Sequence, residues 1–205
     1  MKHTIPLSLL LLLIGFNNYA QNPKEHDRFF LSMSLGVSHF SLNNDITNGP
    51  YNNMKISGPA ATFDIKIGGA IKENFILHGD IISTSSSSAD VTVDGQKIGT
   101  LSGDNSVGMI MVGAGVTYYF MPVNIFISST IGAGNFTIAT GGNDTKTEKG
   151  FGLYLKTGKE WWVSDKWGLG VSMAFNYLKV NNEIMGMTEN LKGSSFGISF
   201  NSTLN

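Results

Sequence analysis

Eight stretches in which apolar residues alternate with small or polar ones are the feature that most restricts how this chain folds. Alternation with a period of two is typical of an extended strand, whose successive side chains point to opposite faces. The stretch 167–177 is the clearest, with large apolar residues at every odd position and Gly, Ser, Ala or Asn at every even one. The eight predicted strands cover residues 29–38, 62–71, 75–81, 109–120, 125–134, 151–158, 167–177 and 195–201.

The connectors between these strands alternate between short and long. Tight turns are predicted at 72–74, 121–124 and 162–166, and longer connectors rich in Asn, Gly, Ser and Thr at 43–58, 85–105, 139–149 and 181–193. Pairing residue 71 with 75, 120 with 125 and 161 with 167 places apolar faces opposite apolar faces, and a slip of one residue would destroy this match. An even strand number with short turns on one side and long loops on the other is typical of outer-membrane barrels.

Alternation alone leaves open whether the apolar face points to lipid or into a soluble, lipocalin-like binding barrel. The other face is mostly Gly, Ser, Thr and Ala, which suit a crowded barrel interior, whereas a water-exposed exterior normally carries Lys and Glu. Aromatic residues gather at the tight-turn ends, as at a membrane interface. The predicted interfacial girdle consists of Phe29, Phe75, Tyr118, Phe120, Trp161, Trp162, Trp167 and Phe200. We therefore predict an all-β fold: an eight-stranded antiparallel transmembrane up-and-down β-barrel with short periplasmic turns and long extracellular loops.

The first twenty residues have the pattern of a cleaved export signal. Lys2 belongs to a short polar start, an apolar run follows from Ile5 to Phe16, and the small residue Ala20 precedes a cut at Gln21. This run is shorter than the roughly 20 apolar residues that a membrane-spanning helix needs. We expect residues 1–20 to be removed after export, and residues 21–205 to form one barrel domain in the cell outer membrane.

Composition argues against several other functions. The chain has no cysteine, so it offers neither a disulfide nor a thiolate metal site. Its net charge of −1 argues against a nucleic-acid partner, which normally requires a basic patch. The Asn- and Asp-rich loop segments lack the spacing of a calcium loop. We predict no metal, no cofactor and no nucleic acid.

A set of charged residues falls on the inward face. The predicted register places Lys66 opposite Asp80, and opposite charges facing each other across strands are favourable. The complete predicted polar network of the lumen is Asp64, Lys66, His78, Asp80, Lys156 and Glu160. Two interpretations stay open: a salt-bridge and hydrogen-bond plug, or a pathway for protons or a small ion. The narrow interior of an eight-stranded barrel favours the plug.

The region from Gly150 to Tyr177 carries a resemblance to a known class, through Gly158-Lys159-Glu160-Trp161-Trp162 and Asp165-Lys166-Trp167-Gly168-Leu169-Gly170. The chain resembles the small eight-stranded outer-membrane barrels of the outer membrane protein A and X type, and the outer membrane protein beta-barrel domain. The resemblance implies contact with outer-membrane lipid and lipopolysaccharide, and insertion by the barrel-assembly machinery. One departure concerns the end of the chain, because Phe200 is followed by five non-aromatic residues where such barrels often end in an aromatic assembly signal.

For function, the sequence favours a structural, adhesion or surface-interaction role carried by the extracellular loops, since loops on rigid scaffolds usually carry specificity. Residues 91–98 are predicted to form a hairpin around an Asp-Gly turn, as an ornament or as an edge for a partner. The alternatives are a lipid A-modifying enzyme and a narrow small-solute channel. The enzyme would require a base at the outer rim. His39 lies there beside Ser38 and Ser41 but lacks a local catalytic motif, so we predict no catalytic residue.

Overall fold

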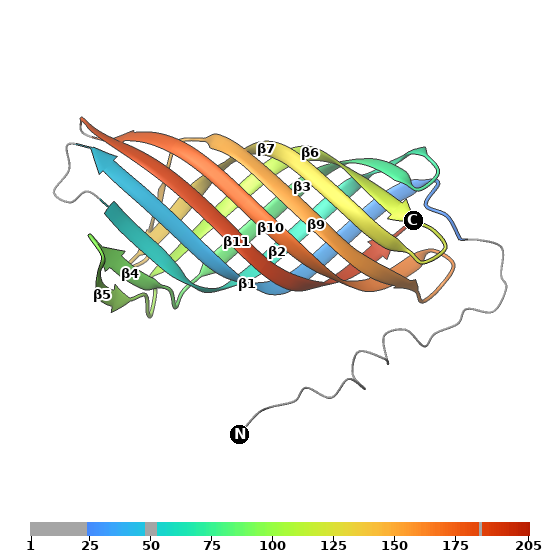
Figure 1. The fold of residues 1–205 in the computed structure, drawn as a ribbon, viewed down its shortest axis with the longest axis horizontal. Helices are drawn as coiled ribbons and strands as arrows, with labels where there is room; N and C mark the ends of the chain where they lie inside the picture. The colour runs from blue at the N-terminus through green and yellow to red at the C-terminus, as the bar shows by residue number, and fades with distance from the viewer. Residues whose placement is uncertain (1–23, 48–52, 185) are drawn as a thin grey trace, which may run out of the picture.

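The structure is a computed structural model that describes residues 24–47, 53–184 and 186–205. Eleven strands form one sheet, and eight of them close into a barrel because β1 pairs with both β2 and β11 (Figure 1). The eight strands of the wall are β1 (Phe29–Thr47), β2 (Asn53–Lys72), β3 (Phe75–Ser86), β6 (Ser106–Phe120), β7 (Ile125–Thr140), β9 (Gly150–Trp162), β10 (Trp167–Ile184) and β11 (Met187–Leu204). All neighbouring pairs are antiparallel, which confirms the predicted up-and-down barrel.

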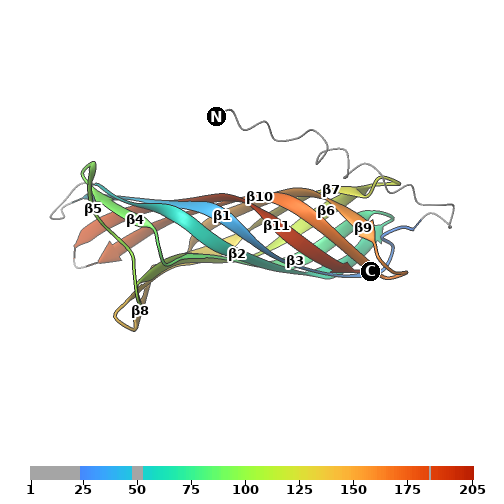
Figure 2. The same cartoon turned by 90° about the horizontal axis from the view of Figure 1, so that it is seen from below.

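Three short strands extend the wall at one end. β4 (Asp90–Val93) pairs with β2 and with β5 (Gln96–Thr100), and β8 (Asn143–Lys146) pairs with β7. Figure 2 shows these additions at the end of the barrel opposite residue 205. We call this the hairpin end, and the opposite end, with the turns at 73–74, 121–124 and 163–166, the short-turn end. Among the described residues no helix is long and apolar enough to cross a membrane.

The predicted register is correct in two hairpins and wrong in the third. Phe120 pairs with Ile125, and Lys66 pairs with Asp80, with a β-bulge between Ala70 and Lys72. In the third hairpin Trp161 pairs with Leu169, two residues away from the predicted partner Trp167. The strand continues through Trp162, so the turn begins one residue later than predicted. A shift of two residues leaves every side chain on its predicted face, which is why the apolar pattern did not reveal it.

The strands are longer at the hairpin end than the sequence predicted. β10 and β11 are joined by residues 185–186 alone, where a connector over 181–193 was expected. β1 and β2 likewise continue to Thr47 and from Asn53, so strand replaces most of the expected connector 43–58. The long extracellular loops of the prediction are therefore largely extended hairpins.

The reason is that the two faces of the wall exchange character along β1, β2, β10 and β11: the apolar side chains pass from the outward face to the inward face. Up to Tyr177 the outward positions of β10 are apolar and the inward ones small or polar, but beyond it Lys179 is exposed and Leu178 is fully buried. In β1 the change falls after Val37, since Phe40 is buried and the outward side carries polar residues. We call the region beyond this change the projecting part; it comprises β1 from His39, β2 up to Pro59, β10 from Lys179, β11 up to Ser194 and the added strands β4, β5 and β8.

The interior is accordingly layered along the barrel axis. The projecting part encloses an apolar core, with Phe40, Leu42, Ile56, Val107, Met109, Phe136, Leu178, Val180 and Leu191 among its members. Near the short-turn end a smaller apolar cluster contains Phe30, Ile76, Tyr119 and Phe126. Buried polar side chains lie between the two. Each fully buried large apolar side chain contributes about 1.5–3 kcal/mol, so the projecting part is stabilised as a water-soluble β-barrel would be.

Candidate functional site

The central layer of the interior holds two buried ion pairs. Lys66 Nζ lies 3.1 Å from Asp80 Oδ2, with side-chain exposures of 3% and 0%, because β2 and β3 place both residues inward and directly opposite. Lys156 Nζ lies 2.8 Å from Asp64 Oδ2 and comes from β9, which is not a neighbour of β2 in the wall. The second pair therefore spans the lumen.

Hydroxyl groups donate further hydrogen bonds to the carboxylates of both pairs, although Asp80 Oδ1 has no partner in the described chain. Asp64 accepts hydrogen bonds from Ser34 Oγ and, at 2.8 Å, from Tyr154 Oη. Asp80 Oδ2 accepts one from Thr130 Oγ1 at 2.9 Å, and Lys66 donates to Ser128 Oγ at 3.1 Å. Such groups are what a buried ion pair requires, because the attraction between its charges barely offsets their loss of hydration.

The pairs are also connected to each other and to His78. The Lys66 ammonium lies 5.0 Å from the centroid of the Tyr154 ring, and Tyr154 binds Asp64. His78 Nε2 lies 2.9 Å from Thr117 Oγ1, which donates to Ser128, the acceptor of Lys66. Five of the six predicted lumen residues thus belong to one network that fills the middle of the barrel.

Glu160, the sixth predicted residue, lies outside this network. Its carboxylate accepts hydrogen bonds from Thr203 Oγ1 at 2.7 Å and from Tyr119 Oη at 3.3 Å. No Lys, Arg or His of the described chain forms an ion pair with it. The expectation that inward charges are paired is therefore wrong for Glu160. It lies four residues after Lys156 on β9, closer to the short-turn end and beyond the two ion pairs.

A cap at the short-turn end was not predicted. His26, which precedes β1, is fully buried and stacks on Tyr119 of β6. Its ring nitrogens contact Asn124 Oδ1 at 2.9 Å and Asn205 Oδ1 at 2.6 Å. The backbone N–H of His26 donates to Asn74 Oδ1, and the backbone N–H of Asn74 donates to the carbonyl of His26. Asn74 and Asn124 have positive φ angles of 64° and 54°, a conformation that asparagine tolerates better than most residues. The sequence signal for the cap is the recurrence of Asn at these turns.

The burial of His26 disfavours its charged form. Burial lowers the pKa of His26 below its ordinary value of 6.5, and the hydrogen bonds to Asn124 and Asn205 and the charge of Asp27 oppose this only in part. A neutral imidazole donates one hydrogen bond and accepts one. When the ring is neutral, one of the two amides presents its NH2 group to it; the Nδ2 atoms of both asparagines have no partner in the described chain.

Of the eight aromatic residues of the predicted girdle, seven lie on the outer wall of the barrel. Phe29, Tyr118, Phe120, Trp167 and Phe200 are exposed on the outer wall, and Phe75 and Trp161 are half-buried on the same face. Trp162 alternates with Trp161 and lies on the lumen side, with its ring 5.0 Å from that of His26. Trp162 is thus part of the cap and not of the girdle. The predicted cleavage site between Ala20 and Gln21 lies outside the described residues.

The hairpin predicted at 91–98 is present as β4 and β5. Asp94 and Gly95 have φ angles of 45° and 83°, as a type I′ turn requires. Lys97 Nζ lies 2.8 Å from Asp90 Oδ1, and this hydrogen bond, with that from Thr100, lowers the pKa of the Asp90 carboxyl. β5 is the last strand in the order, so its outer edge is open with respect to every strand of the described chain.

His39, the residue at the outer rim on which the enzyme alternative depends, has no catalytic partner in the described chain, and no metal-binding group is formed there. His39 lies on the outer wall opposite Pro59 and Phe196, and no hydroxyl or carboxylate group binds its ring in the described chain. No three side chains of the His, Asp and Glu type converge on a metal position in the described ranges. The enzyme alternative gains no support from His39.

Neither a family model nor a curated protein sequence matches the chain. Among solved structures, Neisserial surface protein A is 15% identical, with 84% of this chain and 96% of that chain covered and a TM-score of 0.52. The outer membrane protein AlkL is 13% identical (93% and 97% covered, TM-score 0.47). OprG from Pseudomonas aeruginosa is 10% identical (90% and 100% covered, TM-score 0.47). At such identities the likeness shows the fold alone, and this fold is that of the small eight-stranded outer-membrane barrels.

Proposed function

We propose that this chain is an outer-membrane barrel that passes no solute and acts at the cell surface, where its projecting part contacts a protein or surface ligand. The exchange of faces along the wall is the observation that carries this proposal. The apolar outward run of β10 from Trp167 to Tyr177 covers eleven residues, the length of a tilted membrane-spanning strand. Beyond it, a polar exterior around an apolar core is suited to water.

The filling of the lumen argues against transport. A solute would have to pass the cap around His26, the buried ion pairs and the apolar core of the projecting part. The apolar core offers no hydrogen bonds to water or ions, and opening the ion pairs would leave charges buried without partners. A closed barrel leaves its outer surface and hairpins as the parts that meet other molecules.

We orient the barrel with its short-turn end toward the periplasm and its hairpin end toward the exterior, because outer-membrane barrels have short periplasmic turns and longer extracellular loops. The same proposal includes export by the signal of residues 1–20, insertion by the barrel-assembly machinery and contact with lipopolysaccharide. The open edge of β5 is the part of the projecting region best suited to pair with an extended segment of a protein partner.

The experiment that tests this function has two arms. The chain is reconstituted in planar bilayers, where we expect no discrete conductance. It is also displayed on a Gram-negative host, alongside a variant in which 90–100 is replaced by a Gly-Ser linker of equal length, and adhesion to epithelial cells and to other host cells is measured. We expect adhesion that the replacement removes while the barrel stays folded. Steady conductance, with adhesion the same in both strains, would reject the proposal.

A further inference from the structure

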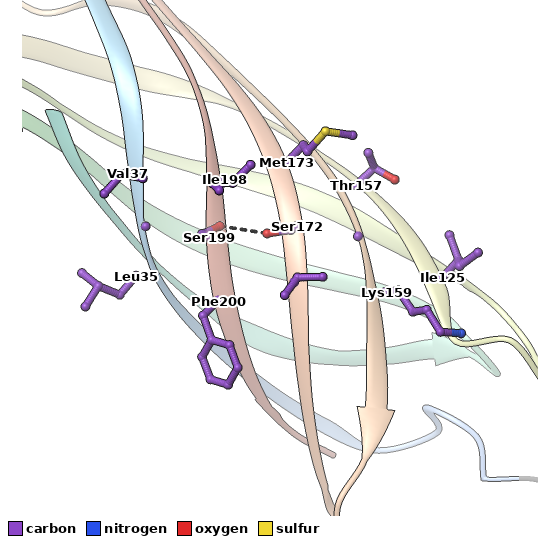
Figure 3. A pocket seen from close by; sticks show the side chains of 13 residues that line it. Leu35, Val37, Ile125, Thr157, Lys159, Ser172, Met173, Ile198, Ser199 and Phe200 are labelled. Carbon is purple, nitrogen blue, oxygen red and sulfur yellow. Dashed lines mark hydrogen bonds between the residues drawn. The ribbon is translucent and has the colours of Figure 1, made fainter. Parts of the chain in front are cut away.

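A furrow of about 740 Å³ crosses the outer wall over β1, β11, β10 and β9 (Figure 3). Two rows of outward side chains form its sides, and each row consists of direct cross-strand neighbours. The row nearer the short-turn end is Leu35, Phe200, Val171, Lys159 and Ile125. The second row is Val37, Ile198, Met173 and Thr157. The floor is the backbone between the rows, where the serines point inward and Ser172 bonds to Ser199 at 2.8 Å.

The furrow runs obliquely from near the short-turn end toward the middle of the apolar belt. By apolar belt we mean the part of the outer wall whose outward side chains are apolar. Ile125 is the first residue of β7, and Lys159 lies only three residues from the end of β9 at Trp162. On the other side, Leu35 lies six residues into β1 from the same end of the barrel. Each strand crossed adds about 4.8 Å, so the distance from β9 to β1 is on the order of 14 Å. This distance is a large part of the length of an extended acyl chain.

Lys159 is the one charged residue among those that line the furrow, and it lies at the end of the furrow nearer the short turns. Its Nζ donates to Val123 O at 2.6 Å and lies 5.6 Å from the centroid of the Trp161 ring. No carboxylate of the described chain pairs with it. An ammonium has three donors, so two remain for a ligand. Trp161 belongs to the aromatic girdle, which places Lys159 at the level of lipid headgroups.

We propose that this furrow binds one anionic phospholipid of the periplasmic leaflet, with the phosphate on Lys159 and an acyl chain along the furrow. The inference rests on the proposed outer-membrane location. Carbon-rich walls match an acyl chain, and a fixed cation at the end nearer the short turns matches a phosphate. Thr157 leaves room in the furrow, because it is the smallest outward side chain of the second row and lies two residues before Lys159 on β9.

The test uses the chain purified from the outer membrane of a Gram-negative host and titrated in neutral detergent with dioleoyl phosphatidylglycerol. Native mass spectrometry counts the bound lipid. We expect one tight site, and we expect Lys159→Gln and Thr157→Leu each to weaken it at least fivefold, the first by removing the cation and the second by filling the furrow. Phosphatidylcholine with the same acyl chains is expected to bind more weakly than phosphatidylglycerol.

Two matched controls change the same chemistry elsewhere. Lys72→Gln removes an exposed cation at the short-turn end, and Ala133→Leu adds bulk to an exposed outward position of β7; both are expected to keep the wild-type affinity within twofold. Heat-dependent gel mobility verifies that every variant is folded. Unchanged lipid binding in both furrow variants would overturn the proposal, as would a cross-linked dimer that covers the furrow and excludes lipid.

A separate measurement distinguishes failure of the proposed membrane location from failure of the furrow site. Brominated lipid should quench the tryptophans of the barrel in vesicles. Unquenched tryptophans would reject the membrane location itself, whereas quenched tryptophans with unchanged lipid affinities in the variants would reject the furrow site alone.

Discussion

The imidazole of His26 lies face to face with the phenol ring of Tyr119, with 3.6 Å between the ring centroids and 15° between the ring planes. This contact places the segment before β1 inside the mouth of the barrel. Together with the amides of Asn124 and Asn205, it connects that segment to β6, to the β6–β7 turn and to the residue after β11. One side chain thus joins elements that are far apart in the sequence.

Replacing this side chain is expected to destabilise the barrel. His26→Ala removes the stacking and leaves two buried amides with fewer partners, at a cost of about 2–4 kcal/mol in the free energy of unfolding. Urea unfolding in lipid vesicles, followed by tryptophan fluorescence, measures the loss. His39→Ala is the matched control, because His39 is exposed on the outer wall and should cost almost nothing. Equal stability of the two variants would contradict the role of the cap.

The cap also predicts a pH dependence. Since burial lowers the pKa of His26 from 6.5, the unfolded chain takes up its proton at a higher pH than the folded chain does. The free energy of unfolding therefore falls as the pH drops below about 6.5, until it passes the lowered pKa. The advantage of the wild type over His26→Gln should shrink between pH 7.5 and pH 5. An advantage that grows toward pH 5 would show that the buried ring is charged.

Breaking an ion pair in the lumen should be more costly than removing it whole. Lys66→Met leaves the buried carboxylate of Asp80 without its cation, and the loss expected for such a change is about 3–5 kcal/mol. The double variant Lys66→Met/Asp80→Leu should recover most of it, because no unpaired charge remains. Unfolding in detergent or vesicles provides both values. A single variant as stable as the wild type would refute the pairing.

The exchange of faces predicts opposite behaviour for two phenylalanines. Phe136→Ala creates a cavity in the core of the projecting part, where Phe136 is fully buried, and should cost about 3–5 kcal/mol. Phe196→Ala removes a ring that is 58% exposed on the outer wall, where lipid fills the space, and should cost much less. The same unfolding assay compares the two. Equal losses would mean that the apolar core does not stabilise this region.

Much of the barrel was predictable because period-two alternation records the face of every residue in the apolar belt. The register of Lys66 and Asp80 followed from it. The ends of the strands did not, because the criterion of an apolar outer face fails where Lys179 replaces the apolar residues of β10. A search for alternation of either sense would have found the projecting part.

The candidate sites were less predictable. Sequence alone placed Lys156 and Asp64 inward, but their contact depends on the diameter of the barrel, which no local pattern encodes. The cap was not predicted because His26 lies outside every strand and its partners come from two turns, from β6 and β9, and from residue 205. Trp162 departs from the prediction because a tryptophan at a strand end meets the interface only when it points outward, and Trp162 alternates with the outward Trp161.

The exchange of faces also fixes how deep the barrel sits. A displacement of the barrel toward the cell interior would place Lys55, Lys179 and Lys192 in the hydrocarbon of the bilayer. A lysine on the lipid face near the midplane destabilises a barrel by about 2–4 kcal/mol. Lifting the barrel would expose the isoleucines and phenylalanines of the belt to water. A bilayer thicker than the belt must therefore thin around the protein, since the protein cannot adjust its height. The chain should consequently partition into the thinnest lipid domains available to it.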